Sequence, residues 1–218
     1  MRIKDGATHS LPSGLRSPVS GLILLASGLG LLLTGCSIPL PQAQPDLTRY
    51  FVLQQAVNPA GAPEHARLPV IRLQTVDVPA YLGDKPLAVR RGANEIHYLD
   101  AARWAEPLDQ GLQRNLRLGL SARPGLMIVS RYDPTAKWDY DLKVRVTACE
   151  GTEDGHVLFA ADWVLAPATG SNLPRKAGAF TAQDLTWDGK SPASLVAALS
   201  QGVTQLCDTL AAAVTAAP

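Results

Sequence analysis

The sequence predicts a single α+β domain, with a mostly antiparallel sheet packed by two amphipathic helices, after a signal peptide and a short tether. Near 108–120 and 192–214, apolar residues recur every three or four positions, which is typical of helices with one buried face. Between 140 and 165, two alternating apolar and polar segments flank a turn, which is typical of an antiparallel hairpin. About six strands, mostly hairpin-linked, favour this class over a doubly wound parallel sheet.

Residues 1–35 have the composition of a secretory signal peptide. Arg2, Lys4 and Arg16 precede a run from 21 to 33 that contains no charged residue. This run is shorter than the ~20 apolar residues that a spanning helix needs, so we expect it to be removed after export.

The sequence Leu-Thr-Gly-Cys at 33–36 resembles a lipobox, in which the cysteine thiol receives a diacylglycerol before cleavage. We therefore predict lipidation at Cys36, where acyl chains contribute about 0.8 kcal/mol per buried methylene. The residue after Cys36 is Ser37, whereas an Asp there would favour retention in the inner membrane. Ser37 therefore favours a location at the periplasmic face of the outer membrane. The alternative is an uncleaved membrane helix. Residues 36–48 contain three prolines and read as the lipidated cysteine and an extended tether.

Removing residues 1–35 leaves 183 residues with 17 basic and 18 acidic side chains, a net charge that argues against a nucleic-acid surface. Two cysteines, Cys149 and Cys207, remain beside the lipidated one. An oxidising periplasm permits a disulfide between them, and two buried free thiols are the alternative.

The domain is predicted to cover 49–216, and its first half contains three strand regions and a helix. Aromatic and β-branched residues at 49–54 and at 69–78 predict two strands. Two short segments, 86–91 and 95–99, flank Gly-Ala-Asn and predict a hairpin. A helix is expected from 104 to 120, with Pro107 in its first turn.

The second half is predicted to hold a short strand at 126–130, the hairpin described above with its turn at 150–155, and a long helix. Ser191 followed by Pro192 is typical of an N-cap and a first helical residue.

Catalytic and metal-binding patterns are absent from the sequence. His65, His97 and His156 are far apart and have no metal-ligand spacing, and no phosphate-binding or nucleophile-elbow motif occurs. We therefore predict no metal, no cofactor and no enzyme activity.

Several polar and aromatic pairs still need an interpretation. The acidic pairs 139/141 and 153/154 are interpreted as solvated, and the pair 90–91 as exposed arginines at a hairpin. Trp104 and Trp163 are suited to a lipid groove by their amphipathic rings, but core packing is the commoner role.

The order of these features resembles the ABC-type transport auxiliary lipoprotein family. The most specific likenesses are Val-Pro-Ala-Tyr-Leu at 78–82 and Trp-Ala-Glu-Pro-Leu at 104–108. The resemblance implies an outer-membrane lipoprotein that docks onto an MCE-domain periplasmic tunnel protein in lipid transport, as a homo-oligomer or collar. A cell-envelope scaffold and a periplasmic hydrolase are the alternatives, and the resemblance supplies no site beyond Cys36.

Overall fold

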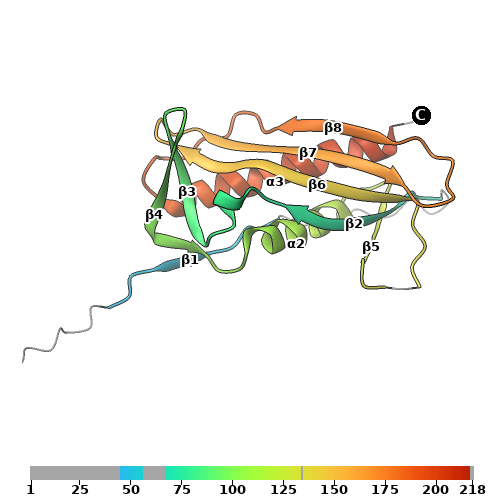
Figure 1. The fold of residues 1–218 in the computed structure, drawn as a ribbon, viewed down its shortest axis with the longest axis horizontal. Coiled ribbons are helices and arrows are strands. Elements are labelled where there is room, and N and C mark those ends of the chain that lie inside the picture. The colour runs from blue at the N-terminus through green and yellow to red at the C-terminus, as the bar shows by residue number, and fades with distance from the viewer. Residues whose placement is uncertain (1–44, 56–66, 134, 217–218) are drawn as a thin grey trace, which may run out of the picture. The chain divides into compact units, whose positions relative to one another are not determined.

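The computed structural model describes residues 45–55, 67–133 and 135–216, and their compact unit begins at Asp46. Figure 1 shows the elements of this unit. The strands are β1 (Arg49–Phe51), β2 (Val70–Asp77), β3 (Pro86–Arg91), β4 (Glu95–Trp104), β5 (Met127–Val129), β6 (Tyr140–Thr152), β7 (Val157–Pro167) and β8 (Lys176–Thr181). The helices are the 3-10 turn η2 (Ala80–Leu82), α2 (Leu108–Ser121) and α3 (Pro192–Thr215).

All eight strands belong to one mixed sheet. Its path runs β1-β4-β3-β6-β2-β5, and β7 pairs with β6 while β8 pairs with β7. The antiparallel pairs are β3–β4, β6–β7 and β7–β8, and the β6–β7 ladder is the longest, from Tyr140↔Pro167 to Gly151↔Val157. The predicted α+β class with a mostly antiparallel sheet is confirmed. Parallel pairing of β2 and β3 with β6, of β1 with β4 and of β2 with β5 was not predicted.

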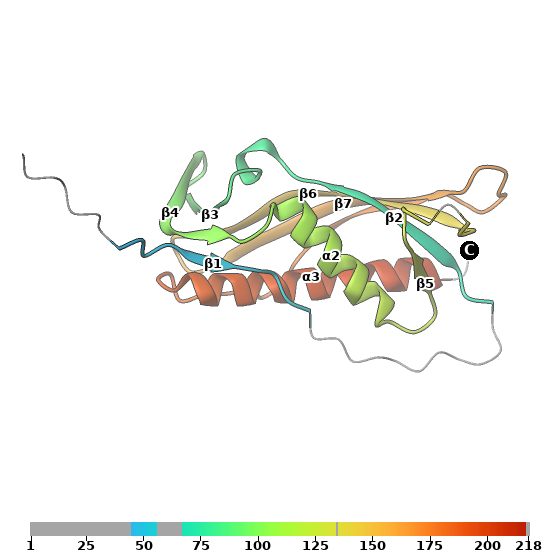
Figure 2. The ribbon, with the colours of Figure 1, turned by 90° about the horizontal axis from the view of Figure 1, so that it is seen from below.

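Both α-helices lie on the same side of the sheet (Figure 2). The alternation of β6 turns Leu142, Val144 and Val146 toward them, and all three are buried. A register shift between Val146 and Ala148 then brings Cys149 to the same face, opposite Phe159 of β7. These side chains pack in one core with the apolar side chains of α3.

The structure changes several predicted boundaries. β4 continues to Trp104, so α2 begins only at Leu108 and Pro107 is its N-cap, not a residue of its first turn. A proline N-cap fits because the first N–H groups of a helix need no intrahelical partner. β1 is only three residues long, β6 continues through Thr152, and β8 was not predicted at all.

Candidate functional site

The first motif segment lines one open groove near the start of α2. The first, 78–82, leads out of β2 through η2, and the second, 104–108, leads from β4 into α2. Asp109 of α2 and Val78 line the groove together with Arg145 of β6, and its volume is about 880 Å³. The groove therefore places the first motif beside Asp109, the residue that follows the second motif in the sequence.

The second motif holds the start of α2 in place. Trp104 is buried, and its backbone N–H donates to the Lys85 carbonyl at 2.6 Å. The backbone N–H of Ala105 donates to the Phe51 carbonyl at 2.9 Å. Glu106, just before α2, forms an ion pair with Arg114, about two helical turns further along. These contacts join β1, β4 and α2, so this motif has a structural role.

One residue of the first motif, Tyr81, contacts a buried carboxylate. Glu150 of β6 has no exposed surface, although it points to the sheet face opposite the helices. Its Oε1 accepts hydrogen bonds from Nε (2.9 Å) and Nη2 of Arg90, and its Oε2 accepts from the Tyr81 hydroxyl (2.7 Å) and the Cys149 N–H (3.0 Å). Tyr98 donates to the Tyr81 carbonyl at 2.8 Å and so holds η2 in position. The cluster fixes the β3–β4 hairpin and η2 onto the sheet.

Electrostatics favour the charged form of Arg90 in this cluster. The hydrogen bond to Glu150 raises the pKa of Arg90, although burial acts in the opposite direction. Burial, with the hydrogen bond and the charge of Glu150, raises the pKa of Tyr81. The tyrosine therefore remains a neutral donor at physiological pH. Sequence reasoning missed Glu150 because it was assigned to a turn.

We expect Tyr81→Phe to lower the free energy of unfolding by about 1–2 kcal/mol, since a buried carboxylate oxygen loses one of its two donors. Urea denaturation measures the change. Tyr98→Phe is the matched control: it removes a hydroxyl that donates to a neutral carbonyl, so its loss should be about half as large. An equal effect of both substitutions would contradict this role for Tyr81.

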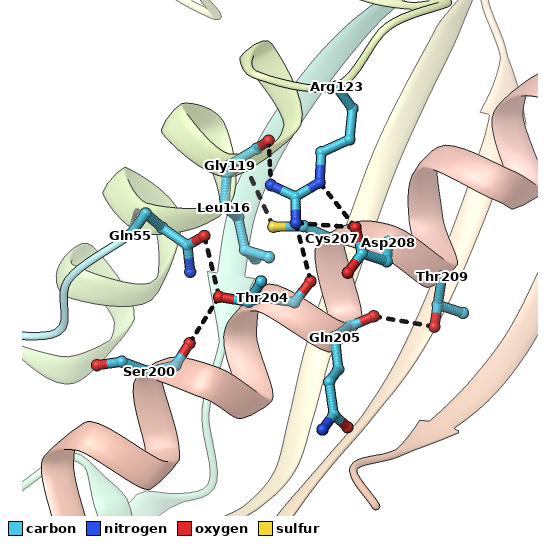
Figure 3. A network of polar contacts seen from close by, with 10 residues as sticks. All are labelled: Gln55, Leu116, Gly119, Arg123, Ser200, Thr204, Gln205, Cys207, Asp208 and Thr209. Carbon is cyan, nitrogen blue, oxygen red and sulfur yellow. Dashed lines mark hydrogen bonds and ion pairs between the residues drawn. The ribbon is translucent and has the colours of Figure 1, made fainter. Parts of the chain in front are cut away.

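A polar network joins the end of α2 to α3 (Figure 3). Arg123 donates to the Gly119 carbonyl at 2.7 Å and to the Thr204 carbonyl at 3.2 Å, and it pairs with Asp208 at 2.9 Å. The Thr204 hydroxyl also contacts Gln55, at 3.3 Å. Carbonyls near a helix C-terminus attract cations, so Arg123 stabilises the end of α2.

Both cysteines of the domain are buried free thiols in the structure. Cys149 lies on β6 opposite Phe159, whereas Cys207 on α3 faces α2, where its sulfur lies 4.0 Å from the Leu116 carbonyl. Different neighbours enclose each thiol in the structure, and whether the two cysteines are paired in the periplasm stays a prediction to be tested. Burial raises the pKa of Cys207 to about 12 and also raises that of Cys149.

We expect both thiols to resist N-ethylmaleimide in the folded protein and to react after unfolding, because only an exposed thiolate reacts quickly. Intact-mass measurement after labelling, with and without urea and with no reductant, checks this. Two adducts on the domain should appear only in urea. A domain that takes up none in urea before reduction contains the disulfide instead.

The acidic pairs that the sequence predicts to be solvated are engaged in structural contacts. Asp141 accepts two hydrogen bonds from Arg72, at 2.6 and 3.0 Å, whose guanidinium lies 3.4 Å from the Trp138 ring centroid. Burial opposes ionisation of Asp141, but bonds from Arg72 and Gln74 outweigh it and lower its pKa. Asp139 accepts from the Val70 N–H at 2.8 Å. Ion pairing and backbone contacts, not solvation alone, explain this pair.

The second acidic pair and the double arginine belong to one end of the sheet. Glu153 pairs with Arg91 at 2.9 Å, and Asp154 accepts from the Thr152 hydroxyl. Arg90 is the partner of the buried Glu150. The prediction of two ordinary exposed arginines is therefore wrong for Arg90, because the shared ladder of β3 and β6 places it beside that carboxylate.

The remaining candidate residues lie apart from one another. Trp104 and Trp163 are buried, which confirms core packing over a lipid groove. His97 lies on β4, and His156 forms a bridge with Thr186, while position 65 is outside the described residues. Among the residues that the structure describes, no group of His, Cys, Asp and Glu side chains has the arrangement of a metal site.

The predicted lipidation residue Cys36 and the signal peptide also lie outside the described residues. Within 45–55, 67–133 and 135–216, no helix is long and apolar enough to cross a membrane. Exposed apolar side chains lie near the start of the domain, at Leu47 and Tyr50.

The chain belongs to the family described as "ABC-type transport auxiliary lipoprotein component", which matches residues 51–211. This makes it an auxiliary lipoprotein of ABC-type transport and implies membrane anchoring in the cell envelope.

Among its relatives, the intermembrane transport lipoprotein PqiC of Escherichia coli is 32% identical over 96 residues. PqiC of Shigella flexneri has the same identity. The match covers 43% of this chain and 49% of either relative, so the chain spans about half the length of these relatives.

Two crystal structures share the fold. One is of an uncharacterized protein, with 22% identity, a TM-score of 0.60 and coverage of 77% of this chain and 98% of that one. The other is of a Xanthomonas campestris protein, with 15% identity, a TM-score of 0.59 and coverage of 77% and 95%.

Proposed function

We propose that this chain is an outer-membrane lipoprotein that docks onto an MCE-domain tunnel protein and so assists lipid transport across the periplasm. The observation that carries the proposal is the family match over 51–211 together with the likeness to an intermembrane transport lipoprotein. In this proposal Cys36 is lipidated after removal of 1–35, residues 36–48 form the tether, and 49–216 form the domain, which acts as a homo-oligomer.

Docking, and not catalysis, is the role that the described contacts support best. Within the first motif, Tyr81 and Leu82 are explained by the buried cluster and the core. Ala80 is different, because its side chain is exposed beside the groove and has no packing role. We therefore assign the partner-docking surface to the groove between this motif and the start of α2.

Affinity purification from detergent-solubilised envelopes, followed by mass spectrometry, tests the proposal. We expect an MCE-domain protein to co-purify with the lipidated chain and to be lost or reduced with Cys36→Ala. A preparation that consistently lacks such a partner would instead favour the envelope scaffold.

A pair of alanine substitutions tests the docking surface. Ala80→Arg places a long cation beside the groove and should abolish recovery of the partner. Ala177→Arg is the matched control, because Ala177 is also exposed but lies on β8. Equal recovery with both variants, at unchanged melting temperature, would place the docking surface elsewhere.

A further inference from the structure

A second groove lies between α2 and the open edge of β2. β5 pairs with β2 only from Val70 to Arg72, whereas β2 continues to Asp77, so its edge beyond Arg72 is not covered by β5. α2 crosses beside this edge, and Gln113 donates to the Gln74 carbonyl at 3.4 Å. The volume of the groove is about 790 Å³, which is in the usual range for ligand sites.

The walls of this groove are rich in cationic donors. Arg114 and Arg117 of α2 line one wall, and Arg131, just after β5, lines the other. Asp109 is the single carboxylate among the lining residues. In the part of the chain that the structure describes, Arg114 pairs with Glu106, while Arg117 and Arg131 have no carboxylate partner. Two guanidinium groups are thus free for an anion.

The groove also has an apolar side. Leu73 and Val129 lie along it, and the exposed ring of Tyr132 stands at its rim. The Arg131 guanidinium lies 5.0 Å from the centroid of this ring, a cation–π contact that orients it. Cationic forks next to apolar surface complement a phosphodiester that is attached to glycerol and acyl carbons.

The geometry points to a binding site for a phosphate-bearing lipid headgroup, held by Arg117 and Arg131 across this groove. The phosphodiester oxygens accept from the two guanidinium groups, and the first acyl carbons lie against Val129 and the ring of Tyr132. The choice of a lipid over a free phosphate rests on the proposed function. The assignment of an anion rests on the groove alone.

Isothermal titration of the chain from residue 36 onward, with Cys36→Ala so that no detergent is needed, tests the site. The probes are dihexanoyl phosphatidylglycerol, below its micellar concentration, and inorganic phosphate. We expect Arg117→Gln/Arg131→Gln to weaken binding of the lipid about tenfold or more, since two charge-assisted contacts are lost. Added salt should weaken binding to the unsubstituted chain, because ions screen exposed charges.

Arg49→Gln/Arg175→Gln is the matched control, because it removes two exposed positive charges outside this groove. It should change the affinity by less than about twofold, because neither residue lines the groove and ions screen exposed charges. Equal weakening by both double variants would overturn the site, as would no binding of the lipid. Phosphate binding as tight as that of the lipid would overturn the lipid assignment. The co-purification of an MCE-domain partner is measured separately, so failure here is distinguishable from failure of the proposed function.

Discussion

Replacement of Arg90 by methionine is expected to lower the free energy of unfolding by about 3–5 kcal/mol, because a fully buried carboxylate loses its charged partner. Glu150 has no exposed surface, and in this variant only the Tyr81 hydroxyl and the Cys149 N–H remain to solvate it. Methionine keeps most of the side-chain volume, so the loss reports on charge and hydrogen bonding. Guanidinium denaturation followed by circular dichroism measures it.

Arg91→Met is the matched control on the neighbouring residue. Arg91 pairs with Glu153 on the surface, where both side chains are about half exposed, so its loss should cost at most about 1 kcal/mol. Arg90→Met/Glu150→Leu should regain most of the stability, since two apolar groups often replace a buried ion pair at little cost. If the double variant were as unstable as the single one, the buried charge would not be the cause.

This cluster also shows why part of the fold was not predictable from the sequence. The alternation of β6 was read correctly up to Val146, but the register shift between Val146 and Ala148 then interrupts the pattern. Glu150 and Gly151 therefore appeared to begin a turn, although they continue the strand. β8 was missed because its sequence, Lys-Ala-Gly-Ala-Phe-Thr, has small side chains and little β-branched content, while pairing with β7 defines it.

The candidate sites also differ in how far the sequence alone predicts them. Lipidation at Cys36 is a prediction from adjacent residues, so a single sequence is enough to make it. The partnership of Arg90 with Glu150 joins residues 60 positions apart and depends on parallel pairing of β3 with β6. A docking protein needs no nucleophile or metal ligands, so its surface leaves few local patterns. Arg117 and Arg131 likewise face one groove only because β5 ends before β2.

Gly119→Ala is expected to lower the free energy of unfolding by about 2–3 kcal/mol, near the upper end of the usual cost of overpacking. A Cβ at this position of α2 would lie 2.6 Å from the sulfur of Cys207 and 3.0 Å from Oε1 of Gln55. The flexible Gln55 side chain is able to move, whereas Cys207 is fixed within α3. The two helices would therefore have to separate where Arg123 joins them. Thermal and urea denaturation measure the loss.

Gly111→Ala, in the same helix, is the matched control. A Cβ there meets its nearest atom, of Glu106, at 3.4 Å, so the substitution should gain the helix propensity of alanine, about 0.5–1 kcal/mol. Cys207→Ala should reduce the cost of Gly119→Ala, because the sulfur that causes the overlap is gone, and the double-mutant cycle should give a coupling of about 1 kcal/mol or more. Strict additivity would show that contact between α2 and α3 does not require glycine at 119.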